Sequence, residues 1–360
     1  MARRLLFYTH GLVGGGAERV FARIASGFAA RGDRVHFFVD FEAHEARPLL
    51  SLAVDLHILP RGHARATWAL ARWLAAEKPD ASLSAISVSN LKHILAATMA
   101  GRNRRAILSY HGYYESEPER LSRLGYRLTP LLTRTAAATV AVSGGLLDDL
   151  KQRFRASPER TRMIFNPAAP DPPPSALSCE SLLERPPLVL AVGRLTPDKD
   201  FATLLRGFAR IARPDARLTI LGEGPLRQAL EDEARALGIA DRLSLPGFTT
   251  DVGRHFEGAR CLAISSRRES FSLVCVEALA FGLPVVATDC GGPQEILNSP
   301  TCGTIVPVGD PIALAEAIGS CLDAPGDPAA RQARASDFTL ERALDSYDAL
   351  IESVIKHGRP

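Results

Sequence analysis

The chain has 360 residues, 46% hydrophobic and 23% charged, which is enough apolar material for two folded domains. Residues 1–167 are basic, with 24 Lys and Arg against 14 Asp and Glu, yet they contain no aromatic ribonucleoprotein motif or zinc-finger pattern, so we expect no nucleic-acid partner. Six scattered cysteines without a C-x-x-C pair favour reduced thiols, and the absence of a signal-like or membrane-spanning apolar run predicts a cytoplasmic protein.

The chain opens with an apolar strand, Arg4 to Tyr8, and a glycine-rich loop at 10–16. Because glycines carry no side chain, this loop can bring its backbone close to a ligand, and a helix with an apolar stripe follows from Ala17. Neither this loop nor Gly222-Glu223-Gly224 completes the dinucleotide fingerprint, and no P-loop lysine follows either of them. The opening therefore predicts a nucleotide-type fold but disfavours NAD and ATP.

The rest of the first domain alternates apolar runs with helical patterns, which predicts a parallel sheet covered on both faces. The expected strands lie near 35–39, 81–86, 106–109 and 139–142, and the expected helices near 64–77, 90–100, 118–135 and 144–154. His111 follows the strand at 106–109, at the edge where such sheets bind ligands. The alternative is a loop histidine satisfied by local hydrogen bonds.

The segment 119–134 mixes five leucines with four arginines. Arginines that extend toward headgroups while leucines enter the interface would bind an anionic membrane surface. The alternative is an ordinary covering helix, kinked by Pro130, with its leucines on the sheet.

A proline-rich linker without apolar periodicity spans 168–187 and separates residues 1–167 from a second doubly wound domain at 188–337. The strands of this second domain are expected near 188–192, 217–221, 242–245, 261–264, 284–287 and 304–306. A final helix with one apolar face follows in 338–360. The pattern thus predicts an α/β protein with two parallel sheets.

The loop after the strand 188–192 carries Arg194 and Lys199, two cations that suit a diphosphate. Asp198-Lys199-Asp200 matches the D-x-D of some metal-dependent enzymes, but a lysine between the aspartates opposes a divalent cation. We therefore expect no metal and no bound cofactor.

The stretch from Ser265 to Ile296 places Glu269 and Glu277 with seven residues between them. A helix expected from about Phe271 to Phe281 would present its first backbone N–H groups, at Phe271, Ser272, Leu273 and Val274, to an anion. Glu269 could then touch the group beyond a bound phosphate, and Glu277 could accept hydrogen bonds from a ribose diol. The alternative is a solvated helical face.

These motifs, together with Pro246-Gly247-Phe248 and Gly291-Gly292-Pro293, resemble the retaining glycosyltransferases of family 4 over nearly the whole chain. The resemblance implies the GT-B fold, with two Rossmann-like domains facing across a cleft and the last helix crossing back to the first domain. Ser272 departs from the commonest pattern, which has glycine there.

The resemblance also implies a role for each matching residue. Arg194 and Lys199 would hold the leaving nucleoside diphosphate, Glu277 the ribose, and Glu269 and His111 the donor sugar. Gly15 and Gly16 would approach the donor phosphates or the acceptor. Further substrate contacts are expected at Gly193, Gly222, Phe271, Ser272, Leu273 and Val274.

The implied activity is transfer of a hexosyl group from a nucleotide sugar, UDP-sugar favoured, to an acceptor hydroxyl, with retention and without metal. The expected setting is lipid-linked glycan or cell-surface polysaccharide synthesis at the inner face of the membrane. The alternatives are a sugar-nucleotide epimerase of the same architecture and a non-catalytic nucleotide-binding subunit.

Overall fold

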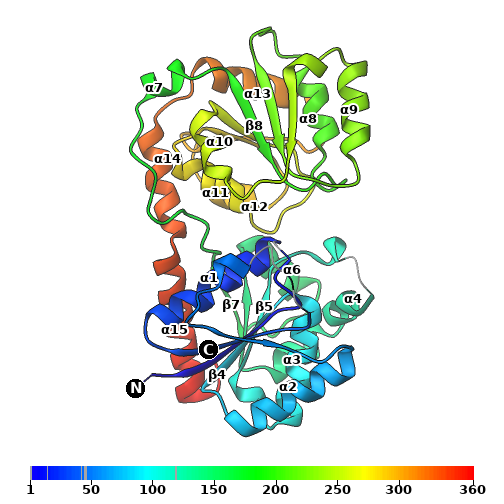
Figure 1. Ribbon diagram of the computed structural model, residues 1–360, viewed down its shortest axis with the longest axis vertical. Coiled ribbons are helices and arrows are strands. Elements are labelled where there is room, and N and C mark those ends of the chain that lie inside the picture. The colour runs from blue at the N-terminus through cyan, green and yellow to red at the C-terminus, as the bar shows by residue number, and fades with distance from the viewer. Residues whose placement is uncertain (1, 14, 42, 44–46, 118–119) are drawn as a thin grey trace. The chain divides into compact units, whose positions relative to one another are not determined.

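The computed structural model describes residues 2–13, 15–41, 43, 47–117 and 120–360. It contains two compact units, of which the first comprises Met1–Pro167 with Leu340–Pro360 and the second Ala168–Thr339 (Figure 1). Residues 168–187, expected as a linker, belong to the second unit and include a short helix, α7 (Cys179–Glu184). Within the described residues, no helix is both long and apolar enough to cross a lipid bilayer.

The first unit is built on a seven-stranded parallel sheet with the order β3-β2-β1-β4-β5-β6-β7. Most of its strands are buried on both faces, as a parallel sheet covered by helices requires. The strands are β1 (Arg4–Tyr8), β2 (Arg34–Val39), β3 (Asp55–Ile58), β4 (Ala81–Ala85), β5 (Ala106–Tyr110), β6 (Ala138–Ala141) and β7 (Thr161–Met163).

Helices cover both faces of this sheet. They are α1 (Gly16–Ala30), α2 (His63–Glu77), α3 (Ser87–Met99), α4 (Arg120–Arg127), α5 (Thr129–Thr135), α6 (Gly144–Gln152) and α15 (Leu340–His357). Figure 1 shows α15 beside α1, where Leu344 packs against Gly27 so closely that a Cβ there would lie 2.5 Å from the leucine. Between elements lie the short 3-10 turns η1 (Arg47–Leu49), η2 (Asn103–Arg105) and η3 (Tyr114–Ser116).

The second unit has a six-stranded parallel sheet with the order β10-β9-β8-β11-β12-β13. Its strands are β8 (Leu188–Val192), β9 (Arg217–Leu221), β10 (Leu243–Gly247), β11 (Cys261–Ile264), β12 (Val285–Thr288) and β13 (Gly303–Val306). Its remaining helices are α8 (Phe201–Phe208), α9 (Arg227–Ala236), α10 (Val252–Gly258), α11 (Leu273–Ala280), α12 (Gly292–Ile296), α13 (Pro311–Asp323) and α14 (Pro328–Ala335), with 3-10 turns η4 (Ala240–Arg242) and η5 (Ser336–Phe338).

The predicted fold class, two doubly wound parallel sheets, is confirmed. The sequence patterns missed β3, β7 and α7, and the single helix expected at 118–135 is two helices. Pro130 stands in the first turn of α5, where its missing N–H costs nothing, so it starts a second helix rather than kinking one. Residues 118 and 119 of that segment lie outside the described residues.

In both sheets the strand order reverses once, between β1 and β4 in the first unit and between β8 and β11 in the second. Loops leaving neighbouring strands in opposite directions open a crevice at the carboxyl edge, which is where doubly wound sheets bind ligands. The loops after β1, β8 and β11 carry the glycines, cations and first glutamate that the sequence predicts to form the site.

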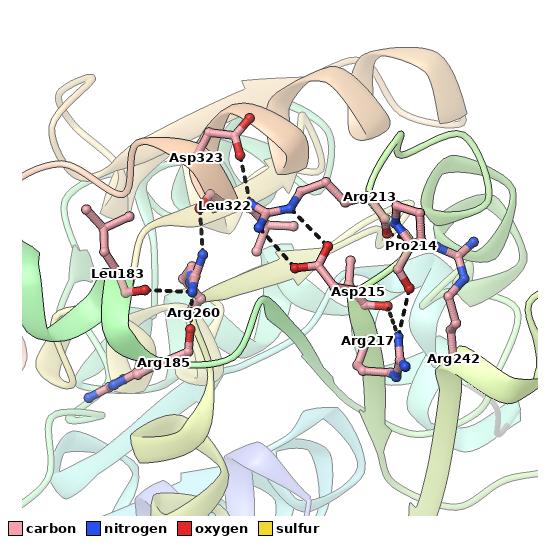
Figure 2. Close-up of polar contacts among 11 residues, drawn as sticks. Leu183, Arg185, Arg213, Pro214, Asp215, Arg217, Arg242, Arg260, Leu322 and Asp323 are labelled. Atoms are coloured by element: carbon pink, nitrogen blue, oxygen red, sulfur yellow. Dashed lines mark hydrogen bonds and ion pairs between the residues drawn. The ribbon is translucent and has the colours of Figure 1, made fainter.

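At the opposite edge of the second sheet, buried Arg260 ties three elements together (Figure 2). Its guanidinium donates to the carbonyl oxygens of Leu183 at 2.8 Å and Leu322 at 3.1 Å, and also to that of Arg185. Nearby, Arg213 bridges Asp215 and Asp323 at the surface. The α7 segment, β11 and the end of α13 are therefore joined through one side chain.

We expect Arg260→Met to destabilise the second unit by about 2–4 kcal/mol, because the buried carbonyls lose charged donors that methionine cannot replace. The matched control is Arg254→Met, since Arg254 is 83% exposed and its ion pair with Asp251 contributes little. Thermal denaturation should show a Tm lowered by roughly 5–10 °C for the first variant and unchanged for the second. Equal Tm values would mean that Arg260 does not hold these elements together.

Candidate functional site

A partly buried ion pair stands at the β8–β11 crevice of the second unit. Lys199, from the loop after β8, places Nζ 2.6 Å from Oε1 of Glu269, from the loop after β11. Ser266 donates its hydroxyl to the same carboxylate oxygen at 2.6 Å. The structure thus brings together two of the predicted site residues, 70 positions apart in the chain.

The electrostatics of this pair keep both groups charged. Burial by itself raises the pKa of the Glu269 carboxyl, but the Lys199 ammonium and the Ser266 hydroxyl outweigh it, so the pKa lies below its ordinary value. For Lys199, burial lowers the pKa and the Glu269 carboxylate more than restores it, so the pKa is raised. Each charge therefore stabilises the other at neutral pH.

Backbone contacts fix the loops that carry the pair. Ser265 donates its hydroxyl to the Lys199 carbonyl at 2.8 Å, and the Arg267 N–H donates to the Asp198 carbonyl at 2.8 Å. Glu269 itself is held to the loop after β12, since its N–H donates to the Cys290 carbonyl at 2.8 Å. Three loops therefore meet at Glu269.

Arg194 lies in the same loop as Lys199, but its side chain is exposed and has no side-chain partner among the described residues. Gly193 and Gly222 pack directly against each other at the ends of β8 and β9. Gly222 has φ +138°, and a Cβ on it would overlap the carbonyl oxygen of Gly193. The close approach of the two loops therefore requires glycine at position 222 regardless of any ligand.

Helix α11 begins later than the sequence predicts. Its first residue is Leu273, with Ser272 as N-cap, so Phe271 lies outside the helix. The Phe271 ring instead packs edge-on against Phe338 with centroids 5.7 Å apart, a contact that no local pattern reveals. The first-turn N–H groups belong to Leu273 and Val274, which share the half-buried face of α11 with Glu277.

In the first unit, Gly15 is the N-cap of α1 and Gly16 its first residue, whereas Gly14 of the same loop lies outside the described residues. A Cβ on Gly15 would collide with the carboxylate of Glu18 in the first turn of α1. Because that carboxylate ends a flexible side chain and Gly15 has an extended backbone with φ −65°, the local packing does not by itself require glycine at this position.

His111 follows β5 and is held by two neighbours. Its Nε2 lies 2.9 Å from the Ser109 hydroxyl, and its ring meets Phe21 edge-on. Burial lowers the pKa of His111 to about 3. The imidazole is therefore neutral at physiological pH and can give or accept a hydrogen bond without carrying charge.

Two family models match this chain. The model described as Glycosyltransferase Family 4 matches residues 14–171, and the model described as Glycosyl transferases group 1 matches residues 179–337. Together they account for most of both units. The chain belongs to glycosyltransferase family 4.

Curated relatives of this family 4 chain include the N-acetylgalactosamine-N,N'-diacetylbacillosaminyl-diphospho-undecaprenol 4-alpha-N-acetylgalactosaminyltransferase of Campylobacter jejuni. That protein is 32% identical over 182 residues, which are 50% of this chain and 49% of the relative. D-inositol 3-phosphate glycosyltransferase of Salinispora tropica is 30% identical over 253 residues, 62% of this chain and 52% of the relative. The chain spans about half the length of the curated relatives it matches.

Among solved structures, Anabaena HepE in complex with UDP and glucose superimposes with a TM-score of 0.84 at 20% identity, covering 98% of this chain and 100% of HepE. The lipopolysaccharide outer core galactosyltransferase WaaB in its apo form gives a TM-score of 0.74 at 17% identity, covering 98% and 99%. These likenesses show the fold and confirm the GT-B class expected from the sequence.

One polar cluster in the first unit was not predicted from the sequence, because none of its residues belongs to the family 4 motifs. At the carboxyl ends of β1 and β2, Asp40 accepts from the Tyr8 hydroxyl at 2.8 Å, lies 2.5 Å from Nδ1 of His10, and pairs with Lys92 of α3. The available signals were Asp40, directly after β2, and His10, two residues after the end of β1. Lys92 gave no signal, because an isolated lysine in an apolar helix usually points to solvent.

Proposed function

We propose that the protein is a retaining glycosyltransferase that moves a hexosyl group from a nucleotide sugar, UDP-sugar favoured, to an acceptor hydroxyl in lipid-linked glycan or cell-surface polysaccharide synthesis. The observation that carries the proposal is the Lys199–Glu269 pair beside the start of α11, at the strand-order reversal of the second sheet. Family membership supports it, and a neighbour in fold was crystallised with UDP and glucose.

Catalysis in this proposal is mainly electrostatic. Charge that appears on the departing diphosphate would be stabilised by Lys199, Arg194 and the first N–H groups of α11, at Leu273 and Val274. Glu277, on the same helix face, would accept from the ribose hydroxyls. Glu269 and, from the first unit, neutral His111 would orient the sugar.

The surroundings of Glu269 argue against a covalent glycosyl intermediate on its carboxylate. One oxygen already accepts from Lys199 and Ser266, and its lowered pKa makes the group a weak base and nucleophile. We therefore infer that an oxygen of the leaving phosphate takes the acceptor proton, on the face from which the nucleotide departs. Transfer on that face retains the anomeric configuration.

We also propose that the reaction needs no metal or bound cofactor, because Lys199 and Arg194 supply positive charge at the diphosphate. Of the two aspartates flanking Lys199, Asp200 already pairs with Arg267 at 3.1 Å. Turnover unchanged by EDTA would support metal independence, and loss of turnover restored by Mg²⁺ or Mn²⁺ would refute it.

Thermal-shift titration with UDP, GDP and ADP tests the base, and release of nucleotide from common sugar donors tests the sugar. We expect UDP to raise Tm most and one UDP-sugar to turn over, with the anomeric configuration of the product read by NMR. An epimer formed from donor alone would favour the epimerase, whereas binding without release with any acceptor would favour a non-catalytic subunit.

His111 gives a prediction about pH. Because its pKa is about 3, its protonation state does not change between pH 5 and 9, so it should add no acid limb to the pH profile of kcat/KM. His111→Ala should still lower kcat/KM by about 5- to 150-fold at every pH in that range. An acid limb near pH 6–7 that disappears in His111→Gln would contradict this assignment.

We further propose peripheral attachment to an anionic membrane through the segment 119–134, described from Arg120 onward. Leu124 on α4 and Leu131 on α5 are 44% and 62% exposed, whereas α4 packs on α3 through its small residues instead. Liposome sedimentation at low salt checks this, since equal partitioning with neutral and anionic vesicles would remove the proposal.

A further inference from the structure

An open apolar groove lies between α2 and α3 in the first unit. Both helices leave the carboxyl edge of the sheet, so they run in the same direction, and Figure 1 shows them side by side. The groove has a volume of about 1260 Å³ and is lined along all of α2, from His63 to Glu77. Fifteen helical residues extend about 22 Å, so the groove is long, and its volume exceeds the roughly 300–1,000 Å³ of a small-molecule pocket.

The walls of this groove are large apolar side chains that the fold leaves uncovered. Trp68 on α2 is 54% exposed, and Leu95 and Met99 on α3 are 50% and 61% exposed. Leu95 and Met99 are four residues apart, so they form one stripe on α3, and this stripe lines the groove together with Trp68 of α2. Soluble proteins rarely leave such side chains together at the surface without an occupant.

The charges around the groove are mostly positive. Arg65 and Arg72 line it, and Arg72 stacks over the Trp68 ring at 5.1 Å. Neither arginine has a carboxylate partner among the described residues. The acidic lining residue Glu77 stands at the far end and is already paired with Arg4 at 2.9 Å. An occupant should therefore combine an apolar chain with negative charge.

One end of the groove reaches the polar cluster at the carboxyl edge of the sheet. His63 and Lys92 line this end, and Lys92 is the buried lysine that pairs with Asp40. His10, bound to the same aspartate, lies with its ring centroid 6.4 Å from that of His63. The apolar groove thus leads to polar groups beside the point between β1 and β4 where the strand order reverses. The first sheet is expected to bind its ligand there.

We propose that this groove holds the hydrocarbon chain of a lipid-linked acceptor, with its anionic headgroup at His63 and Arg65, next to the His10–Asp40–Lys92 cluster. The inference rests on the proposed transferase function and gives the acceptor a class, an amphiphile with a phosphate next to its chain. A second copy of this chain is a weaker occupant, because the unpaired arginines of one copy would meet those of the other.

The two tryptophans of the chain, Trp68 and Trp73, both line the groove and report directly on its occupation. The probe is 8-bromooctyl phosphate, whose bromine quenches tryptophan emission on contact. The matched probes are 2-bromoethyl phosphate, which lacks the chain, and 8-bromooctanol, which lacks the charge. We expect the complete amphiphile to quench at an at least about tenfold lower concentration than either, since chain and charge both add affinity.

Variants separate the two parts of the site. Leu95→Glu should weaken quenching by 8-bromooctyl phosphate about tenfold, because it places a carboxylate against the chain. Arg65→Ala should weaken the charged probe and leave 8-bromooctanol unchanged. The matched control is Leu52→Glu, since Leu52 is 94% exposed and outside the groove, and it should change nothing.

Equal quenching by the charged and uncharged octyl probes, or no effect of Leu95→Glu, would overturn the inference. So would self-association in sedimentation experiments that Leu95→Glu abolishes, since this would assign the groove to a second copy. The quenching readout is independent of donor turnover. Quenching without turnover of any donor would support a lipid site in the groove and refute the transferase proposal. Turnover without quenching would support the transferase proposal and refute the lipid site.

Discussion

Lys199→Met is expected to lower kcat/KM by about 10- to 150-fold and also to destabilise the second unit by about 3 kcal/mol. The first effect follows from losing a charge-assisted contact to the diphosphate. The second follows from leaving Glu269, whose side chain is 7% exposed, as an uncompensated buried charge. Kinetics with the best donor and thermal denaturation measure the two effects separately.

Two further variants separate these effects. Arg194→Met should lower kcat/KM by a similar factor without changing Tm, because the Arg194 side chain is exposed and has no partner among the described residues. Adding Glu269→Gln to Lys199→Met should restore much of the stability, since no buried charge remains, but none of the activity. Normal turnover in both single variants, or recovered activity in the double variant, would contradict the assigned roles.

The pair also predicts the response of stability to acid. The pKa of Glu269 is lower in the folded protein, so its contribution is present above its ordinary pKa of about 4.3 and is lost as the pH falls through the folded value. The wild type should therefore lose stability below about pH 4.3. In Lys199→Met the pKa of Glu269 should rise instead, so acid should relieve part of the destabilisation.

The sequence predicted the buried strands well, because a continuous apolar run between two helical patterns is typical of a strand buried on both faces. It missed the two edge strands, β3 (Asp55–Ile58) and β7 (Thr161–Met163). Both strands are short, and both contain polar and exposed residues. Such strands form because a neighbouring strand offers hydrogen bonds, and the local sequence carries little of that information.

The site was predicted in outline but not in its contacts. The parallel sheet places Lys199 and Glu269 at one edge, so their proximity could be expected, yet both were assigned to substrate and their direct ion pair was not foreseen. The start of α11 was misplaced because Phe271 fits a helical apolar pattern, whereas its ring packs on Phe338. Contacts between residues far apart in the chain decide both details.

Gly222→Ala is expected to be the most disruptive single change in the loops after β8 and β9. At φ +138° the backbone is unfavourable for any residue with a side chain, and the added Cβ would overlap the carbonyl oxygen of Gly193 and lie 2.9 Å from its carbon. Both obstacles are backbone, so no rotamer relieves them. The loop that carries Arg194 and Lys199 must therefore move.

We expect Gly222→Ala to cost about 3–4 kcal/mol of stability and about 100-fold or more in kcat/KM, because small displacements of catalytic groups are costly. The control is Gly238→Ala, which also has positive φ, +68°, but open space around its Cβ, so only about 1–2 kcal/mol should be lost and activity retained. Denaturant titration and steady-state kinetics measure both variants. If Gly222→Ala matched the control in stability and lost only affinity for the donor, the glycine would serve the ligand rather than the packing of the two loops.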